Sequence, residues 1–585
     1  MDKSKKKNME AFWHSAAHVF AEALQEIYPT ATIAIGPPIE QGFHYDFELD
    51  KSLKENDLKQ IEKKMKEITR RNDKLEQKDI SIKEAKDLFK KNPYKIEMIE
   101  DLENAGEKKI SVYTNGSFTD MCKGPHITNL GDIKAIKLLK ISSAYWKGDE
   151  KNKQLTRVYG IAFPSNEELK TWKEKRAQAE ANDHVKLGRE LKLFMTSDLV
   201  GQGLPLLMPR GTKIYQLLTR WIEDEEEKRG YVYTKTPIMA KSDLYKVSGH
   251  WDHYHDGMFI VGNEEKDDTV MALRPMTCPF QFQIYNNGLK SYRDLPVRYA
   301  ETSPLFRKES SGEMHGLTRV SQFTLSEGHL IVTPEQLEHE FKEVVNLINY
   351  VMDTLGIKED ITYRFSKWDP ENKKGKYIDN PGAWKHSEAK MKEILDDLGL
   401  DYEEVEGDAA FYGPKLDLQT INVYGKEDTL ITVQIDFALP ERFNMNYIDK
   451  NGKKQRPYII HRSSIGCYER TMAMLIEKFG GAFPLWLSPE QAIIIPVSES
   501  FAKYAGEVHS TLIEEGIRSK LDDRNETLGY RIREAQKMKV PYIVVVGEKE
   551  VADKSVAVRN RKGKQEVLKT KKFLEKLQKE IKEKK

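Results

Sequence analysis

Cysteine is scarce in this 585-residue sequence. Only Cys122, Cys278 and Cys467 are present, which excludes a disulfide framework and fits a reducing compartment. No apolar run reaches the length of a membrane span, and the N-terminal "MDKSKKKNMEAFW" lacks the apolar core of a secretory signal. These absences predict a cytoplasmic protein with no membrane partner, in which any special cysteine is a ligand or a reactive group.

Net charge is also nearly absent, although the charge is unevenly distributed. The chain carries 94 Lys and Arg against 93 Asp and Glu, whereas residues 551–585 carry 13 basic residues against five acidic ones. A basic end on a neutral chain indicates local contact with a polyanion such as nucleic acid. A solvated lysine-rich tail is the alternative explanation.

The length predicts three or four domains. Apolar spacing predicts a helix over 9–27, and the charge-dense stretch 54–91 predicts a solvated spacer helix. Beyond about residue 196, alternating strands and amphipathic helices lack a βαβ rhythm and favour an antiparallel α+β sheet. From "AIIIPV" to "YIVVVG" a βαβαβ order predicts a small, mostly parallel α/β domain.

Phosphate-binding glycine motifs are missing. Neither a Walker loop nor G-x-G-x-x-G occurs, so a nucleotide needs another kind of site. In "LFRKESSGEMHGLTRVSQF" a strand ends at Arg307 and Glu309, a polar loop follows, and Arg319 begins the next strand. Arginines suit bidentate phosphate contacts, and a carboxylate can accept from an exocyclic amine. Taken alone, this segment favours an exposed charged hairpin over a nucleotide site.

A second segment, "HRSSIGCYERTMAMLIEKFGG", places Gly466, Glu469 and Arg470 at the start of an apolar helix. Glycine permits close backbone packing, and an arginine beside a helix N-terminus creates an anion site. Together the two segments resemble motifs 2 and 3 of class II aminoacyl-tRNA synthetases. The stretch "GLPLLMPRGTKIYQLLTRWIEDEEEKRGYVYTKTPIM" resembles their motif 1, with Pro237 at the proline that helps to build a dimer interface.

Four further stretches, "RPMTCP", "SEGHLIV", "AFYGPKLDL" and "YIIHRSSIGCYER", closely resemble the threonyl-tRNA synthetase family. The resemblance implies an ATP-dependent homodimer that joins L-threonine to tRNA(Thr), with Mg²⁺ accompanying ATP. It also implies one zinc per subunit on Cys278, His329 and His461. The remaining residues that it assigns are a catalytic set, Arg307, Glu309, Arg319, Gln434 and Arg470, and a substrate set, Met276, Glu327, Tyr412 and Lys415.

Zinc that chelates the amine and hydroxyl of threonine rejects valine but not serine, so such an enzyme needs a second, hydrolytic site. "HSAAH" with "TDMCKGPH" resembles the editing domain shared by threonyl- and alanyl-tRNA synthetases. A peptidase motif H-E-x-x-H is excluded because Ser15 stands at the glutamate position. The implied editing residues are His14, His18, Lys95, Asp120, Cys122 and His126. We favour a metal-free pocket, although three histidines and a cysteine could bind zinc.

The stretch from "LDDRNETLGYR" to "VAVRNRKGK" resembles the family's anticodon-binding domain. The resemblance assigns base reading to Asn525, Lys539, Glu550 and Arg559, whose amide and charged groups suit splayed single-stranded bases. The basic excess then meets tRNA phosphates. The domains implied are editing at 1–165, a linker helix at 166–195, a class II catalytic domain with an antiparallel sheet at 196–487, and an anticodon-binding α/β domain at 488–585.

The sequence departs from the family's pattern in four places. Because only 13 residues precede His14 in this sequence, we expect the small ubiquitin-like domain of many relatives to be missing. Glu327 stands at a usual aspartate, Thr429 at a frequent glutamine and Lys539 at a usual arginine. Two rival functions are an alanyl-type enzyme, which would place its synthetase domain first, and a non-catalytic RNA-binding paralogue, which would have lost Arg307, Arg470 or a zinc ligand.

Overall fold

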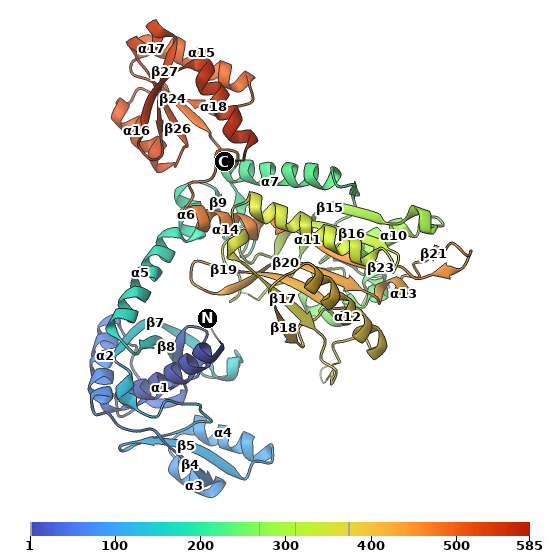
Figure 1. Cartoon of the computed structure of the whole chain (residues 1–585). Coiled ribbons are helices and arrows are strands. Elements are labelled where there is room, and N and C mark those ends of the chain that lie inside the picture. Colours follow the sequence, from blue (N-terminus) through green and yellow to red (C-terminus); the bar gives the residue numbers. More distant parts are fainter. Residues whose placement is uncertain (1–2, 268, 311, 373–374, 585) are drawn as a thin grey trace. The chain divides into compact units, whose positions relative to one another are not determined.

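The computed structural model describes residues 3–267, 269–310, 312–372 and 375–584. It forms two compact units, the first ending at Gln178 and the second beginning at Ala179 (Figure 1). Among the described residues no helix is long and apolar enough to cross a membrane. Mixed helices and mainly antiparallel sheets in both units confirm the predicted α+β multidomain class.

The first unit is built on one long helix, α1 (Lys3–Ile27), which extends beyond the predicted start at Met9. Its apolar face, including Ala16 and Phe20, is fully buried against β3 and β8. The sheet beneath it has the order β1-β3-β8-β7, with β2 paired to β3. Its strands are β1 (Thr32–Ile35), β2 (Pro38–Ile39), β3 (Gly42–Glu48), β7 (Ala135–Tyr145) and β8 (Gln154–Phe163).

The expectation of one solvated helix over 54–91 is wrong. The helix α2 (Glu55–Arg70) ends at Arg70, and its apolar stripe is buried against α1 and β7. A strand, β4 (Glu76–Ser81), and a short helix, α3 (Ile82–Leu88), follow, with Ser81 and Glu84 forming a capping box. Charge density concealed this break, because β4 exposes five of its six residues and keeps only Ile80 buried.

A smaller antiparallel sheet, β4-β5-β6, completes this unit. Its other strands are β5 (Lys109–Asn115) and β6 (Phe118–Met121), and the helix α4 (Pro93–Asn104) begins at the cap residue Asn92. The predicted polar linker is α5 (Asn166–Asn182), which is separated at Asp183 from α6 (His184–Glu190). The linker is therefore two helices rather than one.

The second unit contains an eight-stranded sheet of order β11-β15-β16-β23-β20-β19-β17-β18. Only β11·β15 and β17·β18 pair in parallel among its neighbours, so the predicted antiparallel sheet is confirmed. The strands are β11 (Val232–Tyr233), β15 (Val297–Phe306), β16 (Gln322–Val332), β17 (Ile361–Lys367), β18 (Tyr402–Glu406), β19 (Lys415–Ile421), β20 (Glu427–Asp436) and β23 (Tyr458–Cys467).

Helices pack against this sheet and fix its central strands (Figure 1). They are α7 (Pro209–Glu227), α10 (Cys278–Tyr285), α11 (Leu337–Thr354), α12 (Pro381–Asp397) and α14 (Tyr468–Phe479). The shorter elements are β9 (Phe194–Met195), β10 (Leu206–Leu207), β12 (Met239–Lys241), α8 (Ser242–Ser248), α9 (His250–Tyr254), β13 (Ile260–Val261), β14 (Met271–Leu273), α13 (Leu439–Arg442), β21 (Tyr447–Ile448) and β22 (Lys454–Gln455). The buried core of α11, including Phe341 and Val344, lies against β23.

The C-terminal part has the predicted βαβαβ order. Strands β24, β25 and β26 pair in parallel, and β27 and β28 extend the sheet antiparallel. The elements are β24 (Ala492–Pro496), α15 (Ala502–Glu514), β25 (Ser519–Leu521), α16 (Leu528–Lys537), β26 (Tyr542–Val546), α17 (Glu548–Asp553), β27 (Ser555–Asn560), β28 (Gln565–Lys569) and α18 (Thr570–Lys582).

Candidate functional site

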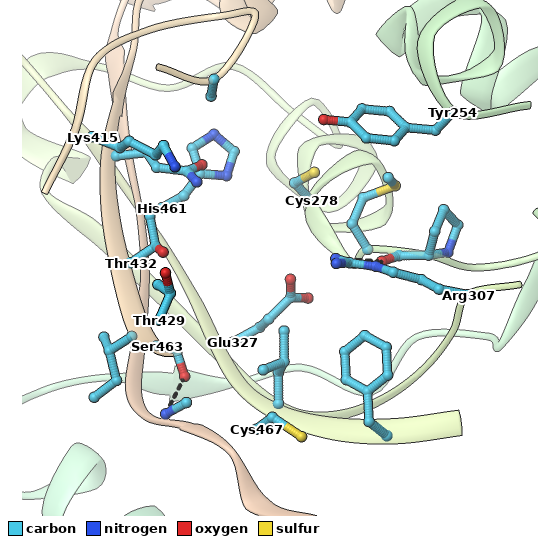
Figure 2. A pocket seen from close by; sticks show the side chains of 18 of the residues that line it. Tyr254, Cys278, Arg307, Glu327, Lys415, Thr429, Thr432, His461, Ser463 and Cys467 are labelled. Atoms are coloured by element: carbon cyan, nitrogen blue, oxygen red, sulfur yellow. Dashed lines mark hydrogen bonds between the residues drawn. The ribbon is translucent and has the colours of Figure 1, made fainter. Parts of the chain in front are cut away.

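A cavity of about 710 Å³ opens over the centre of the large sheet. Figure 2 shows Arg307 and Glu327 pointing into it, with Cys278 and His461 at its wall. Every residue predicted for catalysis, substrate or zinc in this part of the chain lines the cavity. They are Met276, Cys278, Arg307, Glu309, Arg319, Glu327, His329, Tyr412, Lys415, Gln434, His461 and Arg470.

Three potential metal ligands meet at one end of the cavity. One donor atom from each of Cys278, His329 and His461 lies within 4.8 Å of the others, and all three residues are buried. Two of them face each other across paired strands, because His329 on β16 is in register with His461 on β23. Cys278 is the first residue of α10, so three separate elements deliver the donors.

The outer contacts of these histidines fit a metal. His329 Nδ1 donates to Gln281 Oε1 at 2.5 Å, and His461 Nε2 donates to Asp436 Oδ2 at 2.8 Å. Each contact leaves the opposite ring nitrogen unprotonated and facing its neighbours. Sequence reasoning missed Gln281 and Asp436, although Gln281 lies one helical turn after Cys278 and Asp436 two strand residues after Gln434.

Burial dominates the pKa of two of the donors, Cys278 and His329, in the absence of a cation. It raises the pKa of the Cys278 thiol far above its ordinary value and lowers the pKa of His329 well below its own. The imidazole is thus neutral and ready to coordinate, whereas the thiol needs a nearby cation to become a thiolate. A borderline-soft ion with nitrogen and sulfur ligands, such as zinc, suits this set and would keep an open position.

Glu327 lies beside the donors on β16. Its carboxylate accepts a hydrogen bond from Thr277 N–H at 2.9 Å. Burial raises the pKa of Glu327 and outweighs the side chain of Thr277 and the charge of Arg274, which lower it. Thr429, another departure from the family's pattern, also lines the cavity and donates to Gln419 Oε1 at 3.0 Å.

The arginines of the two nucleotide segments are held by backbone carbonyl groups. Arg307 contacts Pro275 O through Nε and Nη2, at 3.2 and 3.1 Å, and lies over the ring of Phe323. Arg470 donates to Thr318 O and Thr429 O, at 3.0 and 2.6 Å. Neither arginine is neutralised by a carboxylate in these contacts, so both present positive charge to the cavity.

Gly466 has the tight backbone that motif 3 predicts. Its φ is +78°, and a Cβ there would lie 2.3 Å from Leu430 O. Only glycine allows β23 to approach β20 this closely. The strand β23 leads directly into α14.

The other predicted residues are already paired. Arg319 lies 3.3 Å from Glu309 and 2.7 Å from Glu313. Tyr412 donates to Gln434 Oε1, and its ring lies 5.0 Å from that of His461. Lys415 forms an ion pair of 2.9 Å with Asp417.

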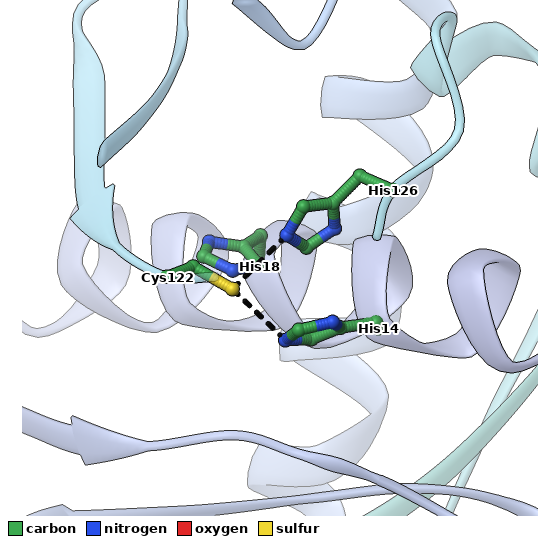
Figure 3. A group of neighbouring side chains, drawn as sticks. All are labelled: His14, His18, Cys122 and His126. Carbon is green, nitrogen blue, oxygen red and sulfur yellow. Dashed lines mark hydrogen bonds between the residues drawn. The ribbon is translucent and has the colours of Figure 1, made fainter. Parts of the chain in front are cut away.

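A second cluster lies in the first unit. Figure 3 shows His14 and His18 on α1 facing Cys122 and His126. Cys122 Sγ lies 3.1 Å from both His14 Nε2 and His126 Nε2, and the four donor atoms lie within 4.8 Å of one another. The two short motifs, separated by about a hundred residues, are therefore brought together as predicted.

Without a cation these four groups are uncharged near neutral pH. Burial lowers the pKa of His14, lowers that of His18 to about 4 and, with the neighbouring histidines, lowers that of His126 to about 2. Burial also raises the pKa of Cys122 to about 11. Neutral imidazoles next to a protonated thiol can accept or relay a proton from water.

Asp120 is the charged centre behind this cluster. Its carboxylate lies 2.6 Å from Lys95 Nζ, and both side chains are 2% exposed. Tyr45 OH donates to the same carboxylate at 2.8 Å, and His18 Nδ1 lies 3.6 Å away. Sequence reasoning missed Tyr45, because its place in "GFHYDFEL" shows only strand alternation.

Ser15, which excluded the peptidase motif, orients His126. Its hydroxyl donates to Ala11 O at 2.9 Å and accepts from Ile127 N–H at 3.0 Å. Its proton is thus committed, so His126 Nδ1, 3.1 Å away, is the donor to Ser15 Oγ. His126 Nε2 is left as an acceptor toward Cys122.

The predicted anticodon residues are distributed over two ends of the C-terminal sheet. Asn525 and Glu550 follow β25 and β26, whereas Lys539 precedes β26 and Arg559 pairs with Ile543 near the start of that strand. Glu550 caps α17 by accepting from Gly547 N–H at 2.9 Å. Arg559 Nε is buried without a hydrogen-bond partner in the described part of the chain.

Comparison with known protein families agrees with this division of the chain. Residues 110–159 match the threonyl and alanyl tRNA synthetase second additional domain. Residues 259–479 match the tRNA synthetase class II core domain (G, H, P, S and T), and residues 491–580 match an anticodon binding domain.

Two relatives that match nearly the whole chain are both described as threonine–tRNA ligases. A threonine–tRNA ligase of Clostridium botulinum (strain Eklund 17B / Type B) is 60% identical over 574 residues, which cover 98% of this chain and 89% of the relative. One from Staphylococcus aureus (strain JH9) is 46% identical, over 94% and 85% of the two chains. The crystal structure of the RNA binding domain of a Cryptosporidium parvum threonyl-tRNA synthetase matches with a TM-score of 0.63 and 35% identity, covering 68% of this chain and 98% of that one.

Proposed function

Since this chain belongs to the threonyl-tRNA synthetase family, we propose that the cavity of the second unit activates and transfers threonine and that the cluster of the first unit edits. The chain is a threonine–tRNA ligase, which uses ATP to attach L-threonine to tRNA(Thr) through a threonyl-adenylate and hydrolyses mischarged seryl-tRNA(Thr). The observation that carries the assignment of the cavity is the convergence of three metal ligands with two carbonyl-held arginines in one space.

We assign one zinc per subunit to Cys278, His329 and His461. Zinc bound there would hold the α-amine and the side-chain hydroxyl of threonine. Gln281 and Asp436 keep the two histidines in the ligating tautomer. Glu327, fixed by Thr277 N–H, is placed to accept from the threonine hydroxyl, and Met276 closes the wall of the same subsite.

The opposite part of the cavity is assigned to ATP with Mg²⁺. Arg307 and Arg470 hold the phosphates, and Glu309 accepts from the adenine amine, oriented by Arg319. As the threonine carboxylate attacks the α-phosphate, the fixed arginine charges stabilise the charge that develops there. Gln434, Tyr412 and Lys415 then line the path of the terminal tRNA ribose in the transfer step.

Amino-acid selectivity tests the assignment of the threonine site. In ATP–pyrophosphate exchange with zinc-replete enzyme, we expect threonine to be favoured over serine by only ~10–200-fold, because serine lacks one methyl group. Valine should be disfavoured by about 10⁴-fold or more, because it leaves the hydroxyl partner unmet. Steady-state kcat/KM for the three amino acids measures both ratios. Absence of exchange with threonine, or equal use of valine, would contradict the assignment.

The editing site is assigned to His14, His18, Lys95, Asp120, Cys122 and His126, working without metal. His14 serves as the general acid or base near the seryl ester, and Asp120 with Lys95 orders the attacking water. Cys122 lines the pocket and excludes the threonyl methyl group. The alternative is a second zinc on the three histidines and the cysteine, which the donor distances also accommodate.

The replacement His14→Ala tests this pocket. We expect hydrolysis of seryl-tRNA(Thr) to fall by about 10²–10⁴-fold, since a positioned acid or base contributes that much. Threonyl transfer should persist, because it takes place in the second unit. Deacylation of preformed seryl-tRNA, beside aminoacylation with threonine, measures the two. His44→Gln, on β3 beside Tyr159 and outside the cluster, is the matched control. Unchanged seryl-tRNA clearance in His14→Ala would refute the assignment.

The remaining assignments concern assembly and tRNA. We propose domains at 1–165, 166–195, 196–487 and 488–585, with Asn525, Lys539, Glu550 and Arg559 reading anticodon bases. We also propose that the protein is cytoplasmic and a homodimer. The dimer is supported by apolar side chains around Pro237, since Val232, Ile238 and Met239 are exposed in the single chain. The editing-type match lies on the N-terminal side of the synthetase core, which favours this order over an alanyl-type arrangement.

A further inference from the structure

His184 is the first residue of α6, directly after the linker helix α5 and its cap residue Asp183. Its side chain is 1% exposed. Nδ1 lies 2.7 Å from Glu477 Oε1 on α14, and Nε2 accepts from Leu317 N–H at 3.2 Å. One imidazole thus joins the loop between β15 and β16 to the helix that carries Arg470.

The hydrogen-bond pattern allows one orientation and one neutral tautomer. Because Leu317 N–H donates to Nε2, that nitrogen carries a lone pair, and the ring proton lies on Nδ1 and is donated to Glu477. The loop backbone comes unusually close at Gly316, where φ is +50° and a Cβ would lie 2.2 Å from His184 Nε2. The loop backbone at Gly316 and Leu317 is therefore in direct contact with the imidazole ring of His184.

Arg470 holds the same loop one residue further along the chain. Leu317 donates its N–H to His184, whereas Thr318 gives its carbonyl oxygen to Arg470 Nε at 3.0 Å. Glu477 lies seven residues after Arg470, two turns along the same face of α14. The contacts form a closed ring that runs from His184 through the loop to Arg470 and back along α14 through Glu477.

A metal does not explain this group. Asp183, His184 and His315 have donor atoms within 4.8 Å of one another. However, both ring nitrogens of His184 are already used. The Asp183 carboxylate accepts from the N–H groups of Val185 and Lys186, at 2.9 and 3.1 Å, and from Tyr424 OH at 3.0 Å. These contacts make Asp183 a helix cap.

We propose that His184 is a positioning residue for ATP: it holds the loop against Arg470, so that the phosphate-binding arginine is oriented before ATP arrives. His184 does not belong to the described residues that line the cavity, so it acts through Leu317 and Glu477. The inference rests on the proposed role of Arg470. It also means that the start of α6 is hydrogen-bonded to the loop and to the helix that hold Arg470.

The test compares variants that keep only one of the two hydrogen bonds of His184, either the one to Glu477 or the one from Leu317 N–H. His184→Asn can still donate to Glu477 but does not reach Leu317, whereas His184→Gln can place an acceptor near Leu317. Glu477→Gln still offers Nδ1–H an oxygen. We expect the KM for ATP in pyrophosphate exchange to rise about tenfold in His184→Asn, the worth of one hydrogen bond. It should recover toward wild type in His184→Gln and change less than about twofold in Glu477→Gln.

Threonine and folding provide the contrast. The KM for threonine and the zinc content should match those of the wild type and of His386→Gln, which replaces an exposed histidine on α12. An unchanged KM for ATP in His184→Asn, or a rise in both KM values together with a lower midpoint, would overturn the proposal. The variant Arg470→Ala distinguishes the two proposals. If pyrophosphate exchange is unchanged in Arg470→Ala, the ATP role of Arg470 is wrong. If exchange is lost in Arg470→Ala but the KM for ATP is normal in His184→Asn, only the proposal for His184 is wrong.

Discussion

Replacing Cys278 by alanine is expected to remove the bound zinc and to lower threonine-dependent pyrophosphate exchange by on the order of 10³-fold. The substitution leaves two of three ligands, His329 and His461, which no longer define a three-coordinate site. Threonine then loses two charge-assisted contacts of about 2 kcal/mol each, which correspond to about a thousandfold. Elemental analysis of purified protein and exchange kinetics measure the two effects.

The matched control is Cys467→Ala. This cysteine is also buried and lines the same cavity, but its Sγ contacts Glu469 at 3.3 Å and lies outside the donor group. We expect one zinc per chain in this variant and in the wild type. Full zinc retention in Cys278→Ala would contradict the assignment. Two zinc ions per wild-type chain, one of them retained in Cys278→Ala, would place the second at the cluster of the first unit.

Replacing Asp120 by asparagine is expected to destabilise the first unit by about 3–5 kcal/mol and to abolish editing. Asp120 and Lys95 are both buried, and removing one partner leaves an uncompensated charge. Amide hydrogen exchange of β5 and β6 in the full chain, beside seryl-tRNA deacylation, measures the two losses. The double replacement Lys95→Met with Asp120→Asn removes both charges, so it should recover most of the stability but none of the editing.

The pH dependence of stability has a definite sign at this pair. Burial alone raises the pKa of Asp120, but Lys95, His18 and Tyr45 outweigh it, so the folded pKa is lowered. A lowered carboxyl pKa contributes stability above the unfolded value of about 4, and this contribution disappears as the pH falls through the folded value. The buried histidines of the cluster act at higher pH: the pKa of His18 is lowered to about 4 and that of His126 to about 2, so the unfolded chain takes up protons below about pH 6.5 while the folded unit does not. Wild-type protection of β5 should therefore begin to fall near pH 6.5 and fall further in stronger acid, where Asp120 is protonated. Protection that stays constant from pH 7 to about 5 would contradict this account.

The sequence predicted the potential metal-ligand residues of both sites but not the residues that hydrogen-bond to the side chains of each site and orient them. "HSAAH" presents His14 and His18 one helical turn apart, and resemblance supplied Cys278, His329 and His461. Gln281, Asp436 and Tyr45, which orient those groups, come from segments far apart in the chain. Their roles follow from tertiary contacts, which no local periodicity encodes.

The fold shows the same limit. The antiparallel core and the C-terminal βαβαβ order could be predicted because their apolar strands are long and regular. Residues 71–91 were wrongly expected to continue a helix, since β4 buries only Ile80 and its charged residues satisfy a helical pattern as well. The break at Asp183 was missed because a capping aspartate within a charge-rich stretch resembles any other surface acid.

Because His329 and His461 are paired residues of β16 and β23, the metal site can form only when these two strands are in the correct register. The two strands are joined through the long excursion from Thr333 to Pro457, and successive side chains of a strand point to opposite faces. A slip of one residue in either strand would turn one histidine away from Cys278. Misaligned chains would fail to chelate and would also fail to recognise threonine, so an assembly error would give an inert protein rather than an unfaithful enzyme.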